Sequence, residues 1–231
     1  MMLKRIVASS GVMGSLIALL LLLAAPASAT TIWTDWTSFV AGAPGSATGT
    51  LSGVGVSYVG EVLSNTVING TSGVWAPNSS FIGGTVTASP STVRDAIFLN
   101  GAFAGTNTIT FTAPVVDPVF AIWSLGQPGL AASFTFSATP TFEAGGPNSS
   151  FGGLPITVSG NTVSGREGNG VVQFTGTFSS ISWTDTPENF YGFTVGTAGT
   201  PGPGPVPEPQ TTALLAIGLV GLVLASRRRA A

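Results

Sequence analysis

Apolar and polar residues alternate along short segments in the middle of the chain. Four such segments are Thr108–Thr112, Ser133–Ser137, Val172–Thr175 and Ser180–Thr184, with Ser, Thr or Gln at the polar positions. Alternation with a period of two is typical of a β-strand that has one buried face and one wet face. Val115–Ser124 is more continuously apolar, so we expect a strand that is covered on both faces.

Turn residues separate these segments. Asn69-Gly70, Asn100-Gly101 and Asn169-Gly170 favour tight hairpin turns, because both central residues of such a turn need a positive φ. Pro118 has no backbone N–H, which predicts a place at a sheet edge or a bulge. The middle of the chain shows no helical period, and we expect about ten short strands. The predicted fold class is all-β: an antiparallel β-sandwich or jelly roll.

The first 29 residues have the pattern of a secretory signal peptide. Two basic residues near the start precede an apolar run, Leu16–Ala25, and the segment closes on the small residues Ala27 and Ala29. This order predicts a signal helix with cleavage after Ala29, so that the mature chain begins at Thr30. The Sec translocon and signal peptidase are the expected partners. The alternative is a retained N-terminal anchor.

A second apolar segment, Gln210–Ser226, lies near the other end and is followed by Arg227, Arg228 and Arg229. Its 17 residues would form a helix about 25 Å long, slightly shorter than the ~30 Å hydrocarbon core of a bilayer. It can span as a transmembrane helix if the arginines, acting as the stop signal, reach the lipid head groups. Basic residues at both ends prefer the cytoplasmic side, which places the middle of the chain outside.

The apolar segment is preceded by Val206, Pro207, Glu208 and Pro209. This four-residue box, the apolar segment and the arginines stand in the order found in the C-terminal sorting signal of PEP-CTERM proteins. The chain resembles that signal over about its last 26 residues. The resemblance implies export, transient anchoring in the inner membrane, and processing near the box by an exosortase, a membrane enzyme of Gram-negative bacteria. It also implies a final place at the cell surface or outside the cell, often with exopolysaccharide. The alternative is an ordinary single-pass anchor whose prolines stop the helix.

These observations divide the chain into four predicted parts. Residues 1–29 are the signal peptide, 30–196 a β-sandwich ectodomain, 197–205 a Pro/Gly-rich linker, and 206–231 the sorting signal. The linker favours an extended, solvated tether, because alternating Pro and Gly form neither a helix nor a sheet ladder. The ectodomain also resembles those that often precede such sorting signals, mainly in Pro114–Gly126, Gly165–Phe174 and Phe190–Gly196. This likeness implies an architecture and no biochemical activity.

Composition limits the chemistry of the ectodomain. Charged residues make up only 7% of the 231 residues, and there is no His and no Cys. An imidazole base, a serine-type triad and thiolate metal sites are therefore excluded. Between Thr30 and Pro205, two arginines stand against eight acidic residues, a formal net charge of −6, so we expect no nucleic-acid partner. No catalytic constellation is visible, and we expect no enzyme activity, no catalytic residue and no cofactor.

The five tryptophans are the candidates for sugar contact, because a flat aromatic face matches the C–H face of a pyranose. Trp123 and Trp183 lie in strand patterns and are expected in the core. Trp33 and Trp36 are three residues apart, so in an extended chain they point to opposite faces. Trp75 lies in a loop-like stretch and is the candidate for an exposed glycan contact.

Acidic residues offer two further hypotheses. Asp185 and Glu188 share a turn whose oxygens could bind calcium, although a calcium site normally needs more ligands than this turn supplies. A glycoside hydrolase needs only two carboxylates, yet no pattern brings two of the eight together. The leading interpretation is a non-catalytic structural or adhesion protein of the cell surface or the exopolysaccharide matrix. A carbohydrate-binding module is the alternative, and a hydrolase the third.

Overall fold

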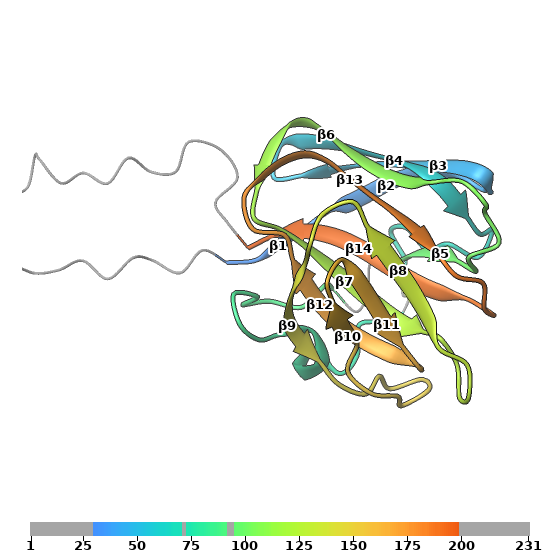
Figure 1. The fold of residues 1–231 in the computed structure, drawn as a ribbon. Coiled ribbons are helices and arrows are strands. Elements are labelled where there is room, and N and C mark those ends of the chain that lie inside the picture. Colours follow the sequence, from blue (N-terminus) through green and yellow to red (C-terminus); the bar gives the residue numbers. More distant parts are fainter. Residues whose placement is uncertain (1–29, 71–72, 92–94, 199–231) are drawn as a thin grey trace, which may run out of the picture.

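The computed structural model describes residues 30–70, 73–91 and 95–198. Within these residues the chain forms fourteen strands and one short 3-10 helix, η1 (Asn78–Phe81). The strands build two antiparallel sheets that pack face to face (Figure 1). The predicted all-β, sandwich-like fold is confirmed. The predicted signal helix and transmembrane helix lie outside the described residues, and no helix inside them is long and apolar enough to cross a membrane.

Each sheet joins strands that are distant in sequence. Sheet A has the order β1 (Ile32–Trp33), β14 (Tyr191–Thr197), β7 (Pro118–Leu125), β12 (Gly168–Gln173) and β9 (Thr141–Gly145), and β5 (Ile97–Leu99) also pairs with β14. Sheet B has the order β10 (Thr157–Ser159), β11 (Thr162–Gly165), β8 (Ala132–Phe136), β13 (Thr177–Asp185), β6 (Asn107–Val116), β4 (Val54–Val62), β3 (Gly42–Leu51) and β2 (Asp35–Val40). From β5 onward the chain crosses repeatedly from one sheet to the other.

The two ends of the described chain lie side by side. β1 pairs antiparallel with β14, with Ile32 opposite Thr197 and Trp33 opposite Gly196. Figure 1 shows the first and last strands leaving the domain on the same side. Segments that precede β1 and follow β14 are therefore attached to one edge of sheet A.

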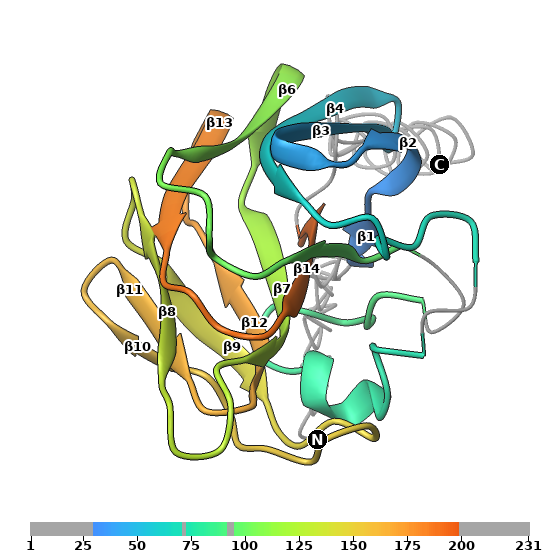
Figure 2. The same cartoon turned by 90° about the vertical axis from the view of Figure 1, so that its right-hand side faces the viewer.

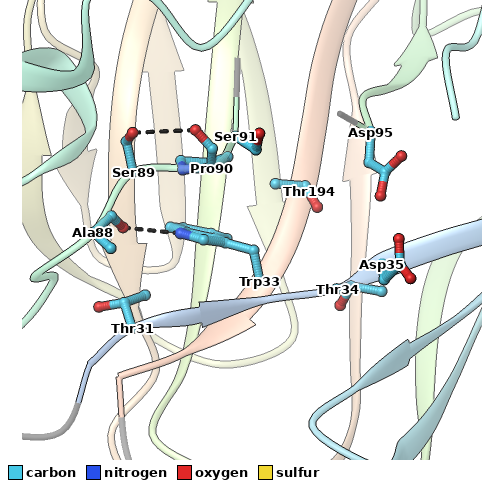
Figure 3. Close-up of a pocket in the computed structure, with 10 residues that line it drawn as sticks. All are labelled: Thr31, Trp33, Thr34, Asp35, Ala88, Ser89, Pro90, Ser91, Asp95 and Thr194. Carbon is cyan, nitrogen blue, oxygen red and sulfur yellow. Dashed lines mark hydrogen bonds between the residues drawn. The ribbon is translucent and has the colours of Figure 1, made fainter. Parts of the chain in front are cut away.

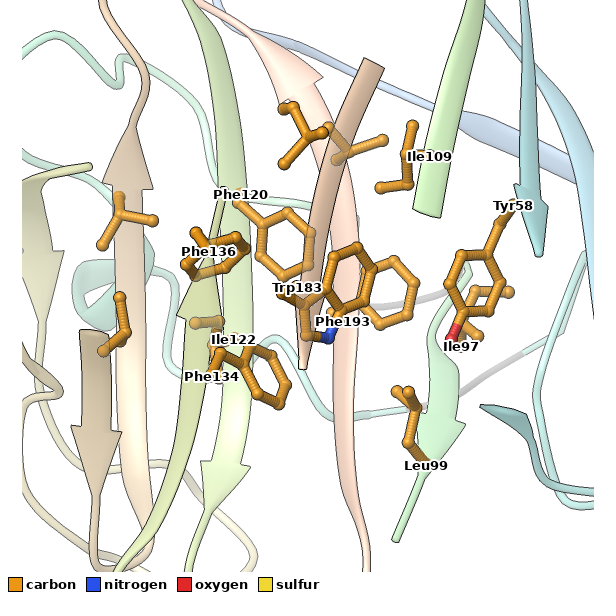
Figure 4. Packing of buried hydrophobic residues seen from close by; sticks show 14 of the residues in the cluster. Tyr58, Ile97, Leu99, Ile109, Phe120, Ile122, Phe134, Phe136, Trp183 and Phe193 are labelled. Atoms are coloured by element: carbon orange, nitrogen blue, oxygen red, sulfur yellow. The ribbon is translucent and has the colours of Figure 1, made fainter. Parts of the chain in front are cut away.

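Aromatic side chains fill the space between the sheets (Figure 4). Phe120 of β7 stacks on Phe193 of β14 with ring centroids 5.0 Å apart, and both rings meet Trp183 of β13 edge-on at 5.1 Å. Edge-to-face and stacked pairs at these distances add stability beyond the area they bury. Because the chain has no cysteine, the fold depends on this core and on its hydrogen bonds.

The opposite face of sheet B carries hydroxyl side chains. Ser38, Thr48, Ser57, Thr110 and Ser180 are cross-strand partners in one row that runs over β2, β3, β4, β6 and β13. All five are exposed, whereas their sequence neighbours Ala47, Tyr58, Ile109 and Ile181 are buried. One wet face explains why the strands of sheet B alternate with a period of two.

Sheet A has a second apolar layer on its outer face. The long connection between β4 and β5, which contains η1, contributes Val74, Trp75, Phe81, Val86 and Ala96 to a cluster that covers β7 and β12 (Figure 2). Every residue of β7 is consequently buried. The expectation of a strand covered on both faces is confirmed for β7, but Val115–Ser124 also contains the end of β6 and a turn at Asp117.

Two predictions about turns and edges are wrong. Pro118 is the first residue of β7, a central strand, and the start of a strand is another position where the missing N–H is tolerated. Asn169-Gly170 lies inside β12, and Asn100-Gly101 joins β5 to β6, which belong to different sheets. A tight hairpin turn is instead made by Ser52-Gly53 between β3 and β4, with φ values of 50° and 86°.

Candidate functional site

A cavity of about 220 Å³ opens beside β1 (Figure 3). Its lining combines one indole ring, several hydroxyls and two carboxylates, contributed by Thr31, Trp33, Thr34, Asp35, Ala88, Ser89, Pro90, Ser91, Asp95 and Thr194. This volume equals the liquid volume of about seven water molecules, less than a drug-sized ligand needs. The cavity therefore fits one small ring or a short side chain.

One wall of the cavity is held to β1 by hydrogen bonds between residues far apart in sequence. The Thr31 N–H donates to Thr87 Oγ1 at 2.9 Å, and the Thr87 N–H donates to Thr31 Oγ1 at 2.8 Å. The indole Nε1–H of Trp33 donates to the Ala88 carbonyl at 2.9 Å. These bonds fix the segment that runs on to Ser91 and orient the ring of Trp33.

The opposite wall depends on Asp95, whose φ of 49° turns the chain sharply before β5. Its carboxylate accepts hydrogen bonds from the N–H groups of Trp36 at 3.0 Å and Asn69 at 2.9 Å. The floor includes Thr194 of β14, whose hydroxyl accepts the indole N–H of Trp36 at 3.1 Å. The side chains around the cavity are thus fixed by contacts on several elements.

Thr34 is the exception among these polar side chains. It is 3% exposed, and its hydroxyl has no hydrogen-bond partner among the described residues. A buried hydroxyl without a partner is costly and uncommon, and this oxygen is itself enclosed by protein, so Thr34 does not offer it to the cavity.

The expectation that Trp75 is an exposed glycan contact is wrong. Trp75 is 0% exposed, and its ring meets Phe81 edge-on at 5.3 Å in the layer over sheet A. Its indole N–H donates to the Asp95 carbonyl at 3.2 Å. The loop-like stretch around Trp75 folds onto the sheet, so the ring supports the wall of the cavity and offers no face to a sugar.

The other tryptophans lie as the sequence predicted. Trp123 and Trp183 are buried in the two apolar clusters. Trp36, in β2 of sheet B, packs in the cluster between the sheets, whereas Trp33, in β1 of sheet A, packs against the outer cluster, so the two do not share a face. Trp33 is thereby the tryptophan that borders the cavity, a role that its sequence context did not distinguish.

Most carboxylates of the domain bind backbone N–H groups of loops. Glu61 accepts from Asn100 and Gly101, Asp117 from Gly176, Glu143 from Thr85, and Glu188 from Gly126. Glu167 accepts the Ser124 hydroxyl. These carboxylates tie connections to strands in a domain without disulfides. Sequence reasoning missed this role, since the partners are 39 residues or more away.

Asp185 and Glu188 face different partners, although they are close in sequence. Asp185 Oδ2 accepts the side-chain amide of Asn107 at 3.1 Å, while Glu188 Oε1 accepts the Gly126 N–H at 2.9 Å. Burial raises the pKa of Asp185 from 3.8 to about 6 and that of Glu188 from 4.5 to about 7. Across residues 30–70, 73–91 and 95–198, no group of three or more acidic, His or Cys side chains could hold a metal ion.

The raised pKa values of Asp185 and Glu188 predict that each of these two carboxyl groups contributes stability in acid that is lost towards neutral pH, and Asp185 is the more buried of the two. The folded state binds the proton more tightly than the unfolded state, so stability is full below about pH 4 and falls as the pH rises through about 6. The shift corresponds to about 2 to 3 kcal/mol in the free energy of unfolding. Urea unfolding at pH 4.5 and pH 8 measures the fall, and Asp185→Asn should remove the part that Asp185 contributes, leaving the part that Glu188 contributes. An equal fall in wild type and variant would exclude Asp185 as its source.

Residues 205–229 match the family model of the PEP-CTERM protein-sorting motif. The chain carries a PEP-CTERM sorting motif. The match contains the predicted box, Val206 to Pro209, and the basic stop signal, Arg227 to Arg229. The motif implies an exported, cell-surface-directed protein that exosortase processes. Comparison with curated proteins and with solved structures gave no match to this chain.

Several predicted site residues lie outside the described residues. They are the signal-cleavage residues Ala27 and Ala29, the box Val206, Pro207, Glu208 and Pro209, and the arginines 227–229. The described domain thus presents the cavity beside β1 as its own candidate site, and the sorting motif provides a separate, processing site.

Proposed function

We propose that this is a non-catalytic structural or adhesion protein of the cell surface or the exopolysaccharide matrix, released from the inner membrane by exosortase. The sorting motif at residues 205–229 is the observation that carries the proposal. It comes soon after β14 ends at Thr197, at the edge of the domain where β1 begins. A tether on that edge leaves the remaining loops and the wet face of sheet B open to the surroundings.

The bonding of the carboxylates supports a non-catalytic role. A hydrolase needs a pair of carboxyl groups facing a cleft that admits its substrate. In the described domain, Glu61, Asp117 and Glu143 are instead engaged with the backbone of loops. Their role is to hold the fold, which suits a protein that persists outside the cell.

Replacing Glu208 with Ala tests the proposed processing. The wild-type protein should lose its C-terminal arginines, because exosortase would read the extended box and cut near it. Glu208→Ala should leave a precursor that is slightly larger on a blot and still contains Arg227–Arg229 by mass spectrometry. Glu143→Ala is the matched control, since it removes an acidic residue outside the box. Equal processing of wild type and Glu208→Ala would contradict recognition of the box.

A carbohydrate-binding module is the second candidate. From β5 onward, successive strands largely alternate between the two sheets. One sheet contains β5, β14, β7 and β12, and the other contains β6, β13, β8 and β11. We propose that this order is a jelly roll, an architecture that occurs in lectin domains. The likeness of architecture is an analogy and carries no ligand by itself. The specific observation in favour is the cavity that Trp33 borders.

A further inference from the structure

We propose that the end of the domain from which both chain ends leave rests on the lipid surface of the inner membrane until exosortase cuts the precursor (Figure 1). This terminal end is defined by Ile32 and by residues 113–117 and 175–177. The inference rests on the proposed processing, in which the apolar segment 210–226 anchors the precursor, and it names the surface that the folded domain turns to the bilayer.

Hydrogen bonds and strand pairing hold the three segments of the terminal end together. Ile32 of β1 lies opposite Thr197, the last residue of β14. The Thr197 hydroxyl donates to the Val116 carbonyl at 2.7 Å. Asp117 and Gly176 exchange two bonds of 2.7 Å: the Asp117 N–H donates to the Gly176 carbonyl, and the Gly176 N–H donates to Asp117 Oδ1. The chain therefore leaves β14 from within this surface.

The terminal end exposes apolar side chains and little charge. Val116 is 45% exposed and Ile32 is 36% exposed, and Ala113 and Pro114 of β6 are exposed as well. Asp117 is the one charged side chain among the residues that define this end, and its carboxylate accepts a backbone N–H. Such a surface can enter the head-group boundary of a bilayer without dehydrating a bare charge.

Acidic residues gather at the opposite end of the sandwich, where β4 and β13 end and β12 and β14 begin. They are Glu61, Glu167, Asp185 and Glu188, beside one arginine, Arg166. The seven residues of β14 separate the two ends by about 20 Å, more than twice the Debye length of about 8 Å at physiological salt. A reversed domain would bring these carboxylates against anionic lipid, so charge turns the terminal end to the membrane.

The distance along the chain keeps this end close to the bilayer. Residues 198–209, twelve residues, separate Thr197 from the apolar segment that begins at Gln210. A chain of this length spans at most about 45 Å. A short tether gives an effective concentration in the millimolar range, so a contact of a few apolar side chains forms that would be too weak between separate molecules. Cleavage at the box removes the tether, and the contact should end with it.

Fluorescent labels at the two ends test the contact. Because the chain has no cysteine, one introduced cysteine carries the only label. Ala113→Cys labels the terminal end, and Ala102→Cys, at an exposed position next to Gly101, labels the acidic end. Each uncut precursor, made in a host without exosortase, is reconstituted in vesicles of phosphatidylethanolamine and phosphatidylglycerol. Emission of an environment-sensitive dye at position 113 should rise about twofold and shift to the blue relative to the cut protein mixed with the same vesicles, and emission at position 102 should not change.

A matched pair of substitutions separates the contact from folding. Val116→Glu places a charge in the contact and should remove most of the rise at position 113, whereas Val59→Glu, at a similarly exposed valine on the wet face of sheet B, should preserve it. Circular dichroism of both variants should match that of the wild type.

Three results would overturn the contact: equal responses of the two labels, an undiminished rise in Val116→Glu, or a rise that grows with the number of precursors per vesicle, which would mean contact between copies. The C-terminal mass of the protein purified from the cells that make it reports processing separately. A failed contact is therefore distinguishable from a failed proposed function.

Discussion

Trp183→Ala should unfold a large fraction of the domain, with a loss of about 4 to 5 kcal/mol in the free energy of unfolding. The indole is 1% exposed and lies between the sheets against the rings of Tyr58, Phe120, Phe134, Phe136 and Phe193, at centroid distances of 5.1 to 5.9 Å (Figure 4). Truncation leaves a cavity that five rings fixed on both sheets cannot fill. The loss is comparable to the whole stability of many domains.

Trp183→Phe is the matched control for this prediction. Trp183 Nε1 has no hydrogen-bond partner within the described part of the chain, so replacing the indole forfeits no hydrogen bond. The expected loss is about 1 to 2 kcal/mol, from the smaller volume alone. Urea unfolding followed by circular dichroism measures both variants. A loss below about 2 kcal/mol for Trp183→Ala would mean that the core around this ring is not tightly packed.

The sequence predicted sheet B well because one of its faces is wet. Thr110 and Ser180 alternate with buried apolar residues, and that alternation is visible in a single strand without knowledge of its partners. The all-β class and the two-sheet packing followed from it. The same alternation predicts that Trp183 is buried, since a large aromatic residue in such a strand fills the space between sheets.

The layer that covers sheet A and the cavity could not be predicted in this way. The outer layer depends on a connection without periodic pattern, which is why Trp75 was expected in solvent and lies buried. The cavity arises where β1 meets the chain near Thr87, 56 residues away. Asn169-Gly170 has the local preference of a turn, but pairing with β7 and β9 places it within β12. Tertiary contacts, absent from any local window, decided each of these positions.

Glu61→Ala should lower the free energy of unfolding by about 3 to 4 kcal/mol, although glutamate is usually a surface residue and the domain already has an excess of negative charge. Glu61 is 3% exposed, and its Oε2 accepts the N–H groups of Asn100 at 3.0 Å and Gly101 at 2.7 Å. Truncation leaves these donors, including the buried one of Gly101, without an acceptor. Glu143→Ala is the matched control: its carboxylate accepts the Thr85 N–H at 2.7 Å in an exposed position, where water can replace it, and should cost less than about 1 kcal/mol.

The pH dependence of Glu61→Ala provides a second measurement that a simple packing defect would not change. The Glu61 carboxylate contributes to the raised pKa of Asp185, after the larger effect of burial. Removing this negative charge should lower the pKa of Asp185, so the fall in stability with rising pH should be smaller and should end at a lower pH than in wild type. Urea unfolding across pH 4 to 8 measures both effects in one series. If Glu61→Ala and Glu143→Ala cost the same, and neither moves the pH profile, the Glu61 carboxylate does not hold the connection between β5 and β6.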